Sequence, residues 1–422
     1  MHSVTNAIPT GTIASIPAKA HAHRALICAA LANSPSTILL SRTSKDIDAT
    51  MDSLRGLGAH VVYENKIVTV TPGPAPAKGN VVPHESGTTL RLLLPVAASI
   101  CNDVDVDAKG RLPDRPLEPM LGEMKAHGVT FSQDKPPFTM TGRLQGGNFS
   151  MVGDVSSQFF SGLLLAAPQI GLSTITSTTP LQSSDYVTLT TETMRDFGVE
   201  VEHTLPDTNI NEAFTVPFGA SFIGRDNYQI EGDWSNAAIW MVAAGMTGKP
   251  ITITGMNKNS VQADRRIMQV MIDAGCDVVW NGMNVTVTGR ASKPFHADLE
   301  QMPDMLPVMA ALSCSISGES SFVKGARLRL KESDRLVAVA NLVKDLGGTV
   351  REEGDDLYII GSGILKGGHG DCVNDHRLVM AGTLMALISE NPVTLQDSEA
   401  ITKSYPHFFE DWNLLGGNAQ PV

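Results

Sequence analysis

Hydrophobic and polar positions alternate along this chain in a unit that recurs about every seventy residues. Five segments combine a helical stretch, a glycine and then alternating apolar residues: LRGLGAHVVYE, MKAHGVTF, MRDFGVEVEH, MIDAGCDVVWN and LVKDLGGTV. A sixth candidate, WNLLGGN, lies near the C-terminus. We expect each glycine to end a helix in the left-handed region before a strand begins. These glycines lie 69 to 77 residues apart and predict an internal repeat: Gly58, Gly128, Gly198, Gly275, Gly347 and Gly416.

A second pattern lies about 40 residues before each of these glycines. It is a short polar head followed by an apolar, alanine-rich body, as in KAHAHRALICAALA, SGTTLRLLLPVAA, SSQFFSGLLLAAP, DWSNAAIWMVAAG, PDMLPVMAALS and DHRLVMAGTLMAL. Such a body predicts a buried helix, and runs such as KIVTVTPG, NVTVTG and DLYIIGSG predict strands. Each unit therefore holds two helices and several strands. Three units form a domain of about 210 residues, so six form two domains.

The boundaries of the domains follow from how the last unit is completed. The chain ends soon after Gly416, so the sixth unit lacks a strand there. We expect the N-terminal segment TIASIP to supply it, because pairing with the opposite terminus closes an open sheet edge. The expected domains are residues 18–230, and residues 1–17 together with 231–422.

Composition excludes several classes of protein. A net charge of −12, a pI of about 5.4 and 5% aromatic residues argue against a nucleic-acid binder. The sequence has neither a secretory h-region nor a run approaching the 18 apolar residues of a membrane span. Its five cysteines are scattered singly, which predicts a reducing cytoplasm and neither disulfides nor zinc. P-loop, dinucleotide-binding and HExxH motifs are absent, and His21 and His23 lack further nearby metal ligands.

Cations gather at the predicted helix starts of this acidic chain. Cations near a helix N-terminus oppose the macrodipole by about 0.3–1 kcal/mol each. A bound anion between the amide groups and the cations would reverse that sign. For RLRLKESDRL (327–336) the alternative is a solvated helix face. We infer a cleft between the domains for a ligand with several negative charges. The cations at first helices are Lys19, Arg24, Arg91 and Arg377, and those at second helices are Arg115, Lys331, Arg335 and Lys403.

Nine ordered motifs carry a resemblance to a known family: KAHAHRALICAALA, ESGTTLR, LPDRPL, DVSSQF, EGDWSNAA, MPDMLP, RLRLKESDRL, DHRLVMAG and ITKSYPHFF. From about Ile13 to Phe409 the chain resembles the 5-enolpyruvylshikimate-3-phosphate synthases (3-phosphoshikimate 1-carboxyvinyltransferases), which are enolpyruvyl transferases. The resemblance implies an α/β (α+β) fold, a two-domain inside-out α/β barrel. Each domain would have three βαβαββ repeats, with helix N-termini facing an active site in the interdomain cleft.

The resemblance also implies an activity. The family transfers the carboxyvinyl group of phosphoenolpyruvate to the 5-hydroxyl of shikimate-3-phosphate and releases phosphate. This addition–elimination belongs to the shikimate pathway, which leads to chorismate and the aromatic amino acids. The reaction uses no metal or cofactor. We expect a cytoplasmic monomer whose partners are its two small-molecule substrates, without nucleic acid or membrane.

The family's site residues carry over motif by motif. Asp304 is the candidate base for the 5-hydroxyl, and Glu332, assisted by Lys19, is the candidate acid for the methylene carbon. The implied phosphoenolpyruvate site is Lys19, Gly87, Arg115, Gln158, Glu332, Arg335, His376, Arg377 and Lys403. The implied shikimate-3-phosphate site is Lys19, Arg24, Ser156, Ser157, Gln158, Ser183, Asp304 and Lys331.

Some positions depart from the family pattern. Ala18 and Ala20 replace the serines usual on each side of the first lysine, and the second change removes a hydrogen bond of about 1 kcal/mol. Arg327 stands where an asparagine is common, and Leu92 stands where proline is usual, which leaves the response to glyphosate open.

Three alternatives remain open. UDP-N-acetylglucosamine enolpyruvyl transferase shares the fold, but its reactive loop cysteine is missing from DAKGRLPDRP, and Cys101 is expected in the core. The RNA 3′-terminal phosphate cyclases use related repeats, but the nucleotide chemistry has no support here. A noncatalytic anion-binding relative would explain Ala18 and Ala20, whereas the retained Lys19, Asp304 and Glu332 speak against it.

Overall fold

The computed structural model describes residues 1–205 and 211–422, and its chain divides into two compact units. Residues 17–230 form one unit, here called the inserted domain. Residues 1–16 and 231–422 form the other, here called the terminal domain. Each domain has its own hydrophobic core.

In the inserted domain, three repeats each contribute two helices. The first helices are α1 (Lys19–Ala30), α3 (Gly87–Ile100) and α5 (Ser157–Ile170), and the second are α2 (Lys45–Gly56), α4 (Met120–Ala126) and α6 (Asp185–Asp196). One sheet contains β14 (Tyr228–Gln229), β3 (Ser36–Leu39), β5 (Ile67–Thr71) and β4 (His60–Glu64). The next contains β6 (Gly79–Val81), β7 (Asp103–Val106), β9 (Phe138–Thr141) and β8 (Thr130–Phe131). The third contains β10 (Asn148–Met151), β11 (Ser173–Ser177), β13 (Glu212–Val216) and β12 (Glu202–Thr204).

The terminal domain repeats this plan. Its first helices are α7 (Trp234–Thr247), α9 (Leu306–Cys314) and α11 (His376–Ala386), and its second are α8 (Ile267–Asp273), α10 (Arg335–Asp345) and α12 (Phe408–Leu414). One sheet contains β2 (Gly11–Ala14), β15 (Ile251–Thr254), β17 (Asn284–Thr288) and β16 (Asp277–Asn281). The next contains β18 (His296–Asp298), β19 (Gly318–Val323), β21 (Asp356–Gly361) and β20 (Thr349–Glu353). The third contains β22 (Gly368–Asp371), β23 (Val393–Gln396), β1 (His2–Val4) and β24 (Ala419–Pro421).

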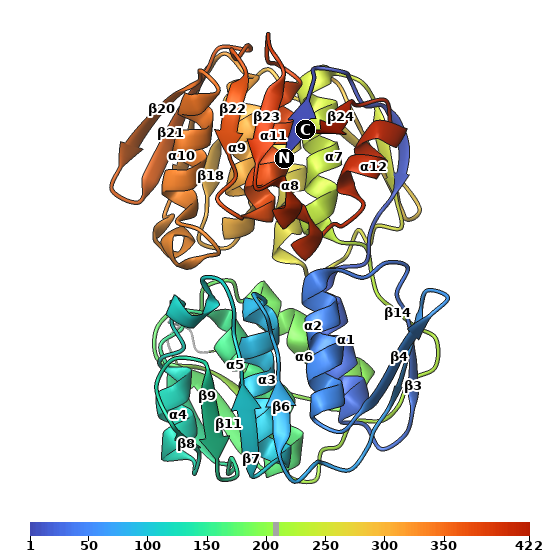
Figure 1. Cartoon of the computed structure of the whole chain (residues 1–422), viewed down its shortest axis with the longest axis vertical. Coiled ribbons are helices and arrows are strands. Elements are labelled where there is room, and N and C mark those ends of the chain that lie inside the picture. Colours follow the sequence, from blue (N-terminus) through green and yellow to red (C-terminus); the bar gives the residue numbers. More distant parts are fainter. Residues whose placement is uncertain (206–210) are drawn as a thin grey trace. The chain divides into compact units, whose positions relative to one another are not determined.

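All six sheets share one strand order, which confirms the predicted βαβαββ repeat. In the second sheet, β6 pairs in parallel with β7, whereas β9 pairs antiparallel with both β7 and β8. The apolar bodies of the first helices are buried, and within each domain α3 packs on α5, and α9 packs on α7 and α11. In the upper domain of Figure 1, α7, α9 and α11 lie inside while β20 and β21 lie at the edge. Helices inside and sheets outside give the expected inside-out α/β arrangement.

The repeat glycines end the second helices, as predicted. Gly58, for example, has a φ of +106° and directly follows the C-cap residue of α2. Beyond it, the Ala59 N–H donates to the Leu54 carbonyl five residues earlier, at 3.0 Å. The other five glycines also have positive φ and are followed by the same five-residue hydrogen bond. This is the Schellman ending, in which glycine avoids the steric cost of a left-handed residue.

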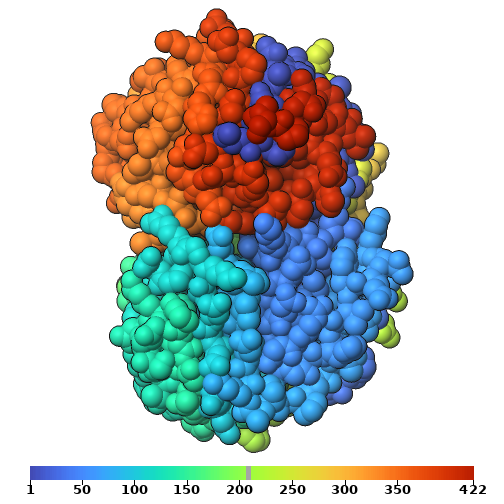
Figure 2. Space-filling model, viewed as in Figure 1, coloured from blue at the N-terminus to red at the C-terminus, as the bar shows by residue number. Residues whose placement is uncertain are grey.

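The sequence predicted that the N-terminal segment TIASIP completes the sixth unit, and this prediction is wrong about which residues do so. Three residues nearer the start, His2–Val4, form β1, which lies between β23 and β24 and completes the sixth sheet. The chain after Gly416 does form a strand, β24. The expected segment contributes β2, which pairs in parallel with β15 in the fourth sheet. Burial explains this division, because Val4 lies in the core between two strands and Ile13 is buried beside β15. Figure 2 shows residues from the start of the chain (blue) among residues from its end (red) on the terminal domain.

Side-chain caps fix the starts of four first helices. Ser86 caps α3, Ser156 caps α5, Asp233 caps α7 and Asp375 caps α11, each by accepting a backbone N–H. Helix α1 differs, because its N-cap is Ala18, whose side chain cannot accept a hydrogen bond.

Candidate active site

The predicted site residues fall into two clusters, one in each domain. The inserted cluster contains Lys19, Arg24, Gly87, Arg115, Ser156, Ser157, Gln158 and Ser183. The terminal cluster contains Asp304, Lys331, Glu332, Arg335, His376, Arg377 and Lys403.

Lys19 is the first residue of α1, where a cation opposes the helix macrodipole. Its Nζ lies 2.7 Å from Oδ2 of Asp46, and both side chains are mostly buried. Asp46 lies in the first turn of α2, where a negative charge is favourable. Sequence reasoning missed Asp46, although an acidic residue just after the helix cap Ser44 was a visible signal.

Arg24 is buried and held by the protein itself. Its Nε donates to Thr190 Oγ1 at 2.7 Å, its Nη1 to the Ala20 carbonyl at 2.7 Å, and its Nη2 to the Tyr186 carbonyl at 3.0 Å. A further bond joins Nη2 to Ser161 Oγ at 3.3 Å. Burial lowers the pKa of this guanidinium to about 10, so it stays charged at neutral pH. Arg24 therefore fastens α1 to α5 and α6 and keeps few donors for a ligand.

Gly87 and Arg115 lie against each other. A β-carbon at Gly87 would lie 2.6 Å from Arg115 Nη1, which is closer than non-bonded atoms approach. Gly87 is the first residue of α3, and Arg115 follows the 3-10 helix η1 (Leu112–Asp114). The missing side chain of Gly87 thus makes room for the Arg115 guanidinium beside the start of α3.

Gln158 belongs to the same part of the inserted domain. Its Oε1 accepts from Arg91 Nη1 at 3.1 Å, and its Nε2 donates to Thr88 Oγ1 at 2.9 Å. Arg91 also donates from Nη2 to the carbonyl of Pro116 at 2.9 Å. Arg91 therefore links the helix that carries Gln158 to the segment that carries Arg115. The sequence marked Arg91 as an unexpected cation but did not assign it to the site.

The three serines of the inserted cluster have different local roles. Ser156 accepts the Gln158 N–H and so caps α5, and Ser157 is buried as the first residue of that helix. Ser183 is buried with a φ of +53°, a backbone conformation that is uncommon for residues other than glycine. Such strain often marks a functional position.

Arg335 is the centre of the terminal cluster. Its Nη1 donates to Asp304 Oδ1 at 2.5 Å, its Nη2 to Glu332 Oε2 at 2.7 Å, and its Nε to Asp375 Oδ2 at 2.8 Å. Burial acts to lower the pKa of Arg335, but the charges of Asp375, Glu332 and Asp304 outweigh it and hold the pKa well above its usual value. One buried guanidinium therefore holds the candidate base and the candidate acid together.

Asp375 is the residue of this cluster that sequence reasoning missed. It is fully buried, caps α11 through the Arg377 N–H at 3.0 Å, and accepts from Ser333 Oγ at 2.9 Å. Its place directly before His376 and Arg377, at a predicted helix start, was a signal for a helix cap. That it would also bind Arg335 from 40 residues away depends on tertiary packing, which the sequence did not show.

Asp304 has a strongly perturbed acidity. Burial raises the pKa of Asp304, but the positive charges of Lys331, Arg335 and Arg377 together lower it by more. The pKa therefore lies well below its usual value. Lys331 Nζ is 3.1 Å from Asp304 Oδ1. Burial lowers the pKa of Lys331, Asp304 opposes this effect, and the positive charges of Arg335 and Arg327 add to the lowering. Without a ligand, Asp304 is therefore an ionised but weak base.

The remaining cations of the terminal cluster bind backbone oxygens. Lys403 Nζ donates to the Asn374 carbonyl at 2.8 Å, and Arg377 Nη1 donates to the Ser235 carbonyl at 3.2 Å. His376 is buried, and its Nδ1 lies 3.8 Å from Asp375 Oδ1. Carbonyl acceptors orient these side chains without cancelling their charge.

Two local predictions need correction. The segment 327–336 is not a single helix start: most of it forms the 3-10 helix η4 (Ala326–Leu330) and a bend, and α10 begins at Arg335. Asp334 caps α10 and also binds Arg329 at 3.1 Å. Arg115 directly follows η1, before α4, and Lys403 is the last residue of the 3-10 helix η5 (Ser398–Lys403), before α12. Prolines at 116, 119 and 406 delay these helices, because proline disfavours a helical residue before it.

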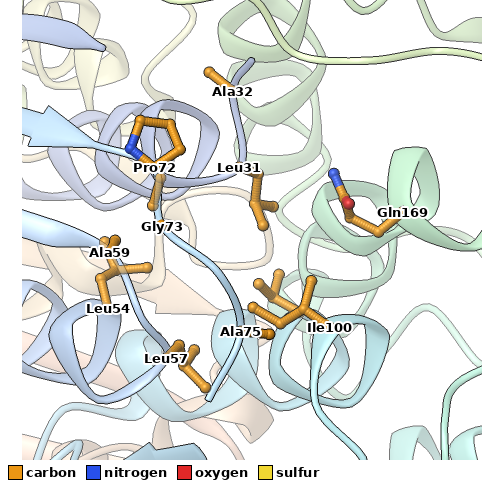
Figure 3. Close-up of a pocket in the computed structure, with 12 residues that line it drawn as sticks. Leu31, Ala32, Leu54, Leu57, Ala59, Pro72, Gly73, Ala75, Ile100 and Gln169 are labelled. Carbon is orange, nitrogen blue, oxygen red and sulfur yellow. The ribbon is translucent and has the colours of Figure 1, made fainter. Parts of the chain in front are cut away.

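The cavity drawn in Figure 3 lies elsewhere in the inserted domain. It has a volume of about 160 Å³ and is lined by the C-terminal ends of α1, α2, α3 and α5 and by residues 72–75. Figure 3 shows Gln169 as the polar side chain at its rim, among aliphatic side chains such as Leu31, Leu57 and Ile100. Because its lining carries no charge, this cavity does not suit an anionic substrate.

Two structural searches bear on other classes of function. Across residues 1–205 and 211–422, no helix has the length and apolar character that a membrane crossing requires. Within the same described ranges, no group of three or more His, Cys, Asp or Glu side chains is placed to hold a metal ion.

The fold and both clusters define a two-domain α/β protein built from six βαβαββ units, and comparisons with known proteins narrow this class. A family model for EPSP synthase (3-phosphoshikimate 1-carboxyvinyltransferase) matches residues 7–412. The 3-phosphoshikimate 1-carboxyvinyltransferase of Clostridium kluyveri is 35% identical and covers 96% of this chain and 95% of its own. That of Methanocorpusculum labreanum is 34% identical and covers 97% of each chain. The solved EPSP synthase of Acinetobacter baumannii has the same fold, with a TM-score of 0.81 at 23% identity over 100% of this chain and 99% of that one. The chain belongs to the EPSP synthase family.

Proposed function

We propose that this protein transfers the carboxyvinyl group of phosphoenolpyruvate to the 5-hydroxyl of shikimate-3-phosphate and releases phosphate. The family match over residues 7–412 supports this reaction, and so do relatives of that name over nearly the whole chain. The structural observation that carries the proposal is Arg335, which holds Asp304 and Glu332 within hydrogen-bond distance of one buried guanidinium.

The two clusters would divide the work. The cations and serines of the inserted cluster suit the ring phosphate and hydroxyls of shikimate-3-phosphate. Lys19, Gly87, Arg115 and Gln158 would also contact phosphoenolpyruvate, together with Arg335, His376, Arg377 and Lys403 of the terminal domain. Holding the reactants in place supplies much of the rate acceleration in such a reaction.

The chemistry needs a base and an acid. Asp304 would take the proton of the 5-hydroxyl as its oxygen attacks C2 of phosphoenolpyruvate, and Glu332, helped by Lys19, would protonate the methylene carbon. The tetrahedral adduct then loses phosphate while the methyl group gives a proton back. Substrate anions beside Lys331 and Arg377 would cancel part of the positive charge that keeps the Asp304 pKa low. Asp304 would therefore become a stronger base once the substrates bind.

The proposal includes a monomeric, cytoplasmic enzyme that works without a metal or organic cofactor. The loop DAKGR before Arg115 contains no cysteine, so the UDP-N-acetylglucosamine reaction has no nucleophile there. Sedimentation of the purified protein tests the oligomeric state.

The decisive experiment measures phosphate release from phosphoenolpyruvate with and without shikimate-3-phosphate. We expect release to require both substrates and to fall at least about 100-fold in Lys19→Ala. Lys45→Ala is the matched control, because Lys45 is also the first residue of its helix but is exposed. Binding of shikimate-3-phosphate without any phosphate release would contradict the proposal and favour a noncatalytic anion-binding protein.

A further inference from the structure

Asp264 is a buried carboxylate that the proposed chemistry does not use. It lies in the 3-10 helix η2 (Ala263–Arg266) and is 1% exposed. Its Oδ2 accepts the hydroxyl of Ser235, and its Oδ1 has no hydrogen-bond partner among the described residues. Burying a carboxylate with one oxygen unsatisfied costs stability, so its retention needs a reason.

Ser235 connects Asp264 to the terminal cluster. The Ser235 hydroxyl donates to Asp264, and the Ser235 carbonyl accepts from Arg377 Nη1 at 3.2 Å. Nε of Arg377 is buried and has no hydrogen-bond partner within the described ranges. Arg377 is therefore held on one side by the residue that Asp264 fixes, and its charge is not cancelled by a direct ion pair to Asp264.

The charged groups around Asp264 oppose one another. Burial raises its pKa to about 6, Asp304 raises it too, and Arg377 and the Ser235 hydrogen bond lower it. Arg265 and Arg266 on its own helix are exposed to solvent. The groups that face the carboxyl are Asp233 and Ser235 at the start of α7, Asp304 on η3 (Pro303–Met305) and Arg377 on α11.

We propose that Asp264 is a positioning residue for Arg377, and that gain or loss of its proton sets how strongly the terminal cluster attracts the phosphoenolpyruvate anion. This inference rests on the proposed function. When Asp264 is ionised, its charge offsets part of the Arg377 charge and weakens anion binding. When Asp264 is protonated, Arg377 acts as a full cation. The transition falls near pH 6.

The test compares the KM for phosphoenolpyruvate of the wild-type protein and of Asp264→Asn from about pH 5 to about pH 7.5. Shikimate-3-phosphate is kept saturating. Taking the ratio of the two values cancels the titration of phosphoenolpyruvate itself. We expect the ratio of wild-type to variant KM to rise from about 1 at low pH to roughly three- to ten-fold at high pH. A ratio that does not change with pH would overturn the proposal.

A second variant separates this role from a structural one. Ser235→Ala removes the hydrogen bond that lowers the Asp264 pKa but keeps the carbonyl that binds Arg377. We expect the midpoint of the KM profile to move upward by about half a pH unit. A loss of packing alone would change the melting temperature and leave the midpoint in place, which would count against the proposal. If Asp264→Asn does not fold, the midpoint in Ser235→Ala decides.

Asp411→Asn is the matched control. Asp411 is a buried aspartate of the same domain that accepts a hydroxyl, from Tyr405 at 2.8 Å, on α12. The KM of Asp411→Asn should depend on pH as the wild-type KM does. If it instead followed Asp264→Asn, the effect would not be specific to Asp264, which would refute the proposal. If the wild-type protein releases no phosphate, the proposed function fails by itself. Calorimetric binding of phosphoenolpyruvate to wild type and Asp264→Asn across the same pH range then still tests the role of Asp264.

Discussion

The two clusters differ in what balances their positive charge. In the inserted cluster, Arg24 and Arg91 donate to hydroxyl, carbonyl and amide oxygens, and Lys19 pairs with Asp46. In the terminal cluster, three carboxylates converge on Arg335 alone.

This difference separates two tasks. Neutral oxygens orient a cation and leave its charge available, so the inserted cluster suits the capture of a substrate anion. Carboxylates cancel the charge and are themselves fixed by it, so the terminal cluster suits the control of proton transfer. Substitutions in the terminal cluster should therefore cost stability and activity together, whereas those in the inserted cluster should mainly weaken binding.

The largest effect is expected from Arg335→Met. It leaves the buried carboxylate of Asp375 and the partly buried carboxylates of Asp304 and Glu332 without their shared cation, which should destabilise the terminal domain by about 3–5 kcal/mol. Phosphate release should fall about 1000-fold, because both candidate proton-transfer groups lose their anchor. Urea unfolding and the phosphate assay measure the two losses.

Arg329→Ala is the control for that prediction. Arg329 lies on the same segment and binds Asp334 and Asp355, but its side chain is 37% exposed. An exposed pair of this kind contributes less than about 1 kcal/mol. Equal losses in both variants would show that the segment, and not the Arg335 charge, matters.

Gly87→Ala should produce the next largest effect. The added β-carbon would collide with Arg115 Nη1 and push this cation away from the start of α3. We expect the KM for phosphoenolpyruvate to rise roughly 10- to 100-fold while the melting temperature changes little. Gly122→Ala on α4 is a matched control, because its β-carbon would meet only the movable end of Glu118 at 3.1 Å. An unchanged KM in Gly87→Ala would remove Arg115 from the site.

A smaller effect is expected from Asp46→Asn. Lys19 would keep a neutral acceptor but lose its counter-charge, so its position would be less fixed. The rate constant kcat should fall about ten-fold, with a stability change within about 1 kcal/mol. Asp48→Asn, in the same first turn of α2, should leave kcat unchanged. If both variants lose activity alike, the helix start matters and the Lys19 pair does not.

The smallest effect concerns pH and the core of the inserted domain. His21 accepts or donates a hydrogen bond with Tyr228 at 2.8 Å, and burial lowers its pKa to about 4. The unfolded chain binds a proton at His21 near pH 6.5, whereas the folded chain stays neutral, so this contribution is complete above pH 6.5 and is lost as the pH falls toward 4.

The variant His21→Gln tests that sign. The free energy of unfolding of the wild type relative to this variant should fall by about 1.4 kcal/mol per pH unit between pH 6 and pH 5. Urea titrations at pH 7, 6 and 5 measure it. A difference that stays constant over this range would mean that His21 is not held neutral.

The sequence predicted the repeat because its signals are local. A glycine after each second helix and an apolar body in each first helix depend on neighbouring residues, and all six of each appear in the structure. The sequence did not predict strand pairing correctly where two distant segments compete for the same partner. Pairing with β23 and β24 could be offered by either N-terminal segment, and only burial of Val4 and Ile13 decides between them.

The candidate site shows the same limit. The motifs predicted Asp304, Glu332 and Arg335 as parts of one site, and in the structure Arg335 contacts both carboxylates. Asp46 and Asp264 were missed, because short acidic turns occur throughout proteins and neither residue lies in one of the nine motifs. Asp375 begins the motif DHRLVMAG, but capping the helix is the ordinary role of an aspartate at that place. Asp46 binds Lys19 from 27 residues away, and Asp375 binds Arg335 from 40 residues away. Asp264 is linked to Arg377 through Ser235, whose carbonyl accepts from a side chain 142 residues away.

The position of β1 has a consequence for the order in which the chain folds during synthesis. The inserted domain is complete once residue 230 has left the ribosome, so it can fold while the rest is still being made. Strand β1 has no partners until Val393 and the residues after it emerge. At ordinary rates of translation, this happens roughly 20 to 80 seconds after β1 itself has been synthesised. Residues that are synthesised early are thus among the last to find their place, and until then β1 is an unpaired strand with which other chains can pair.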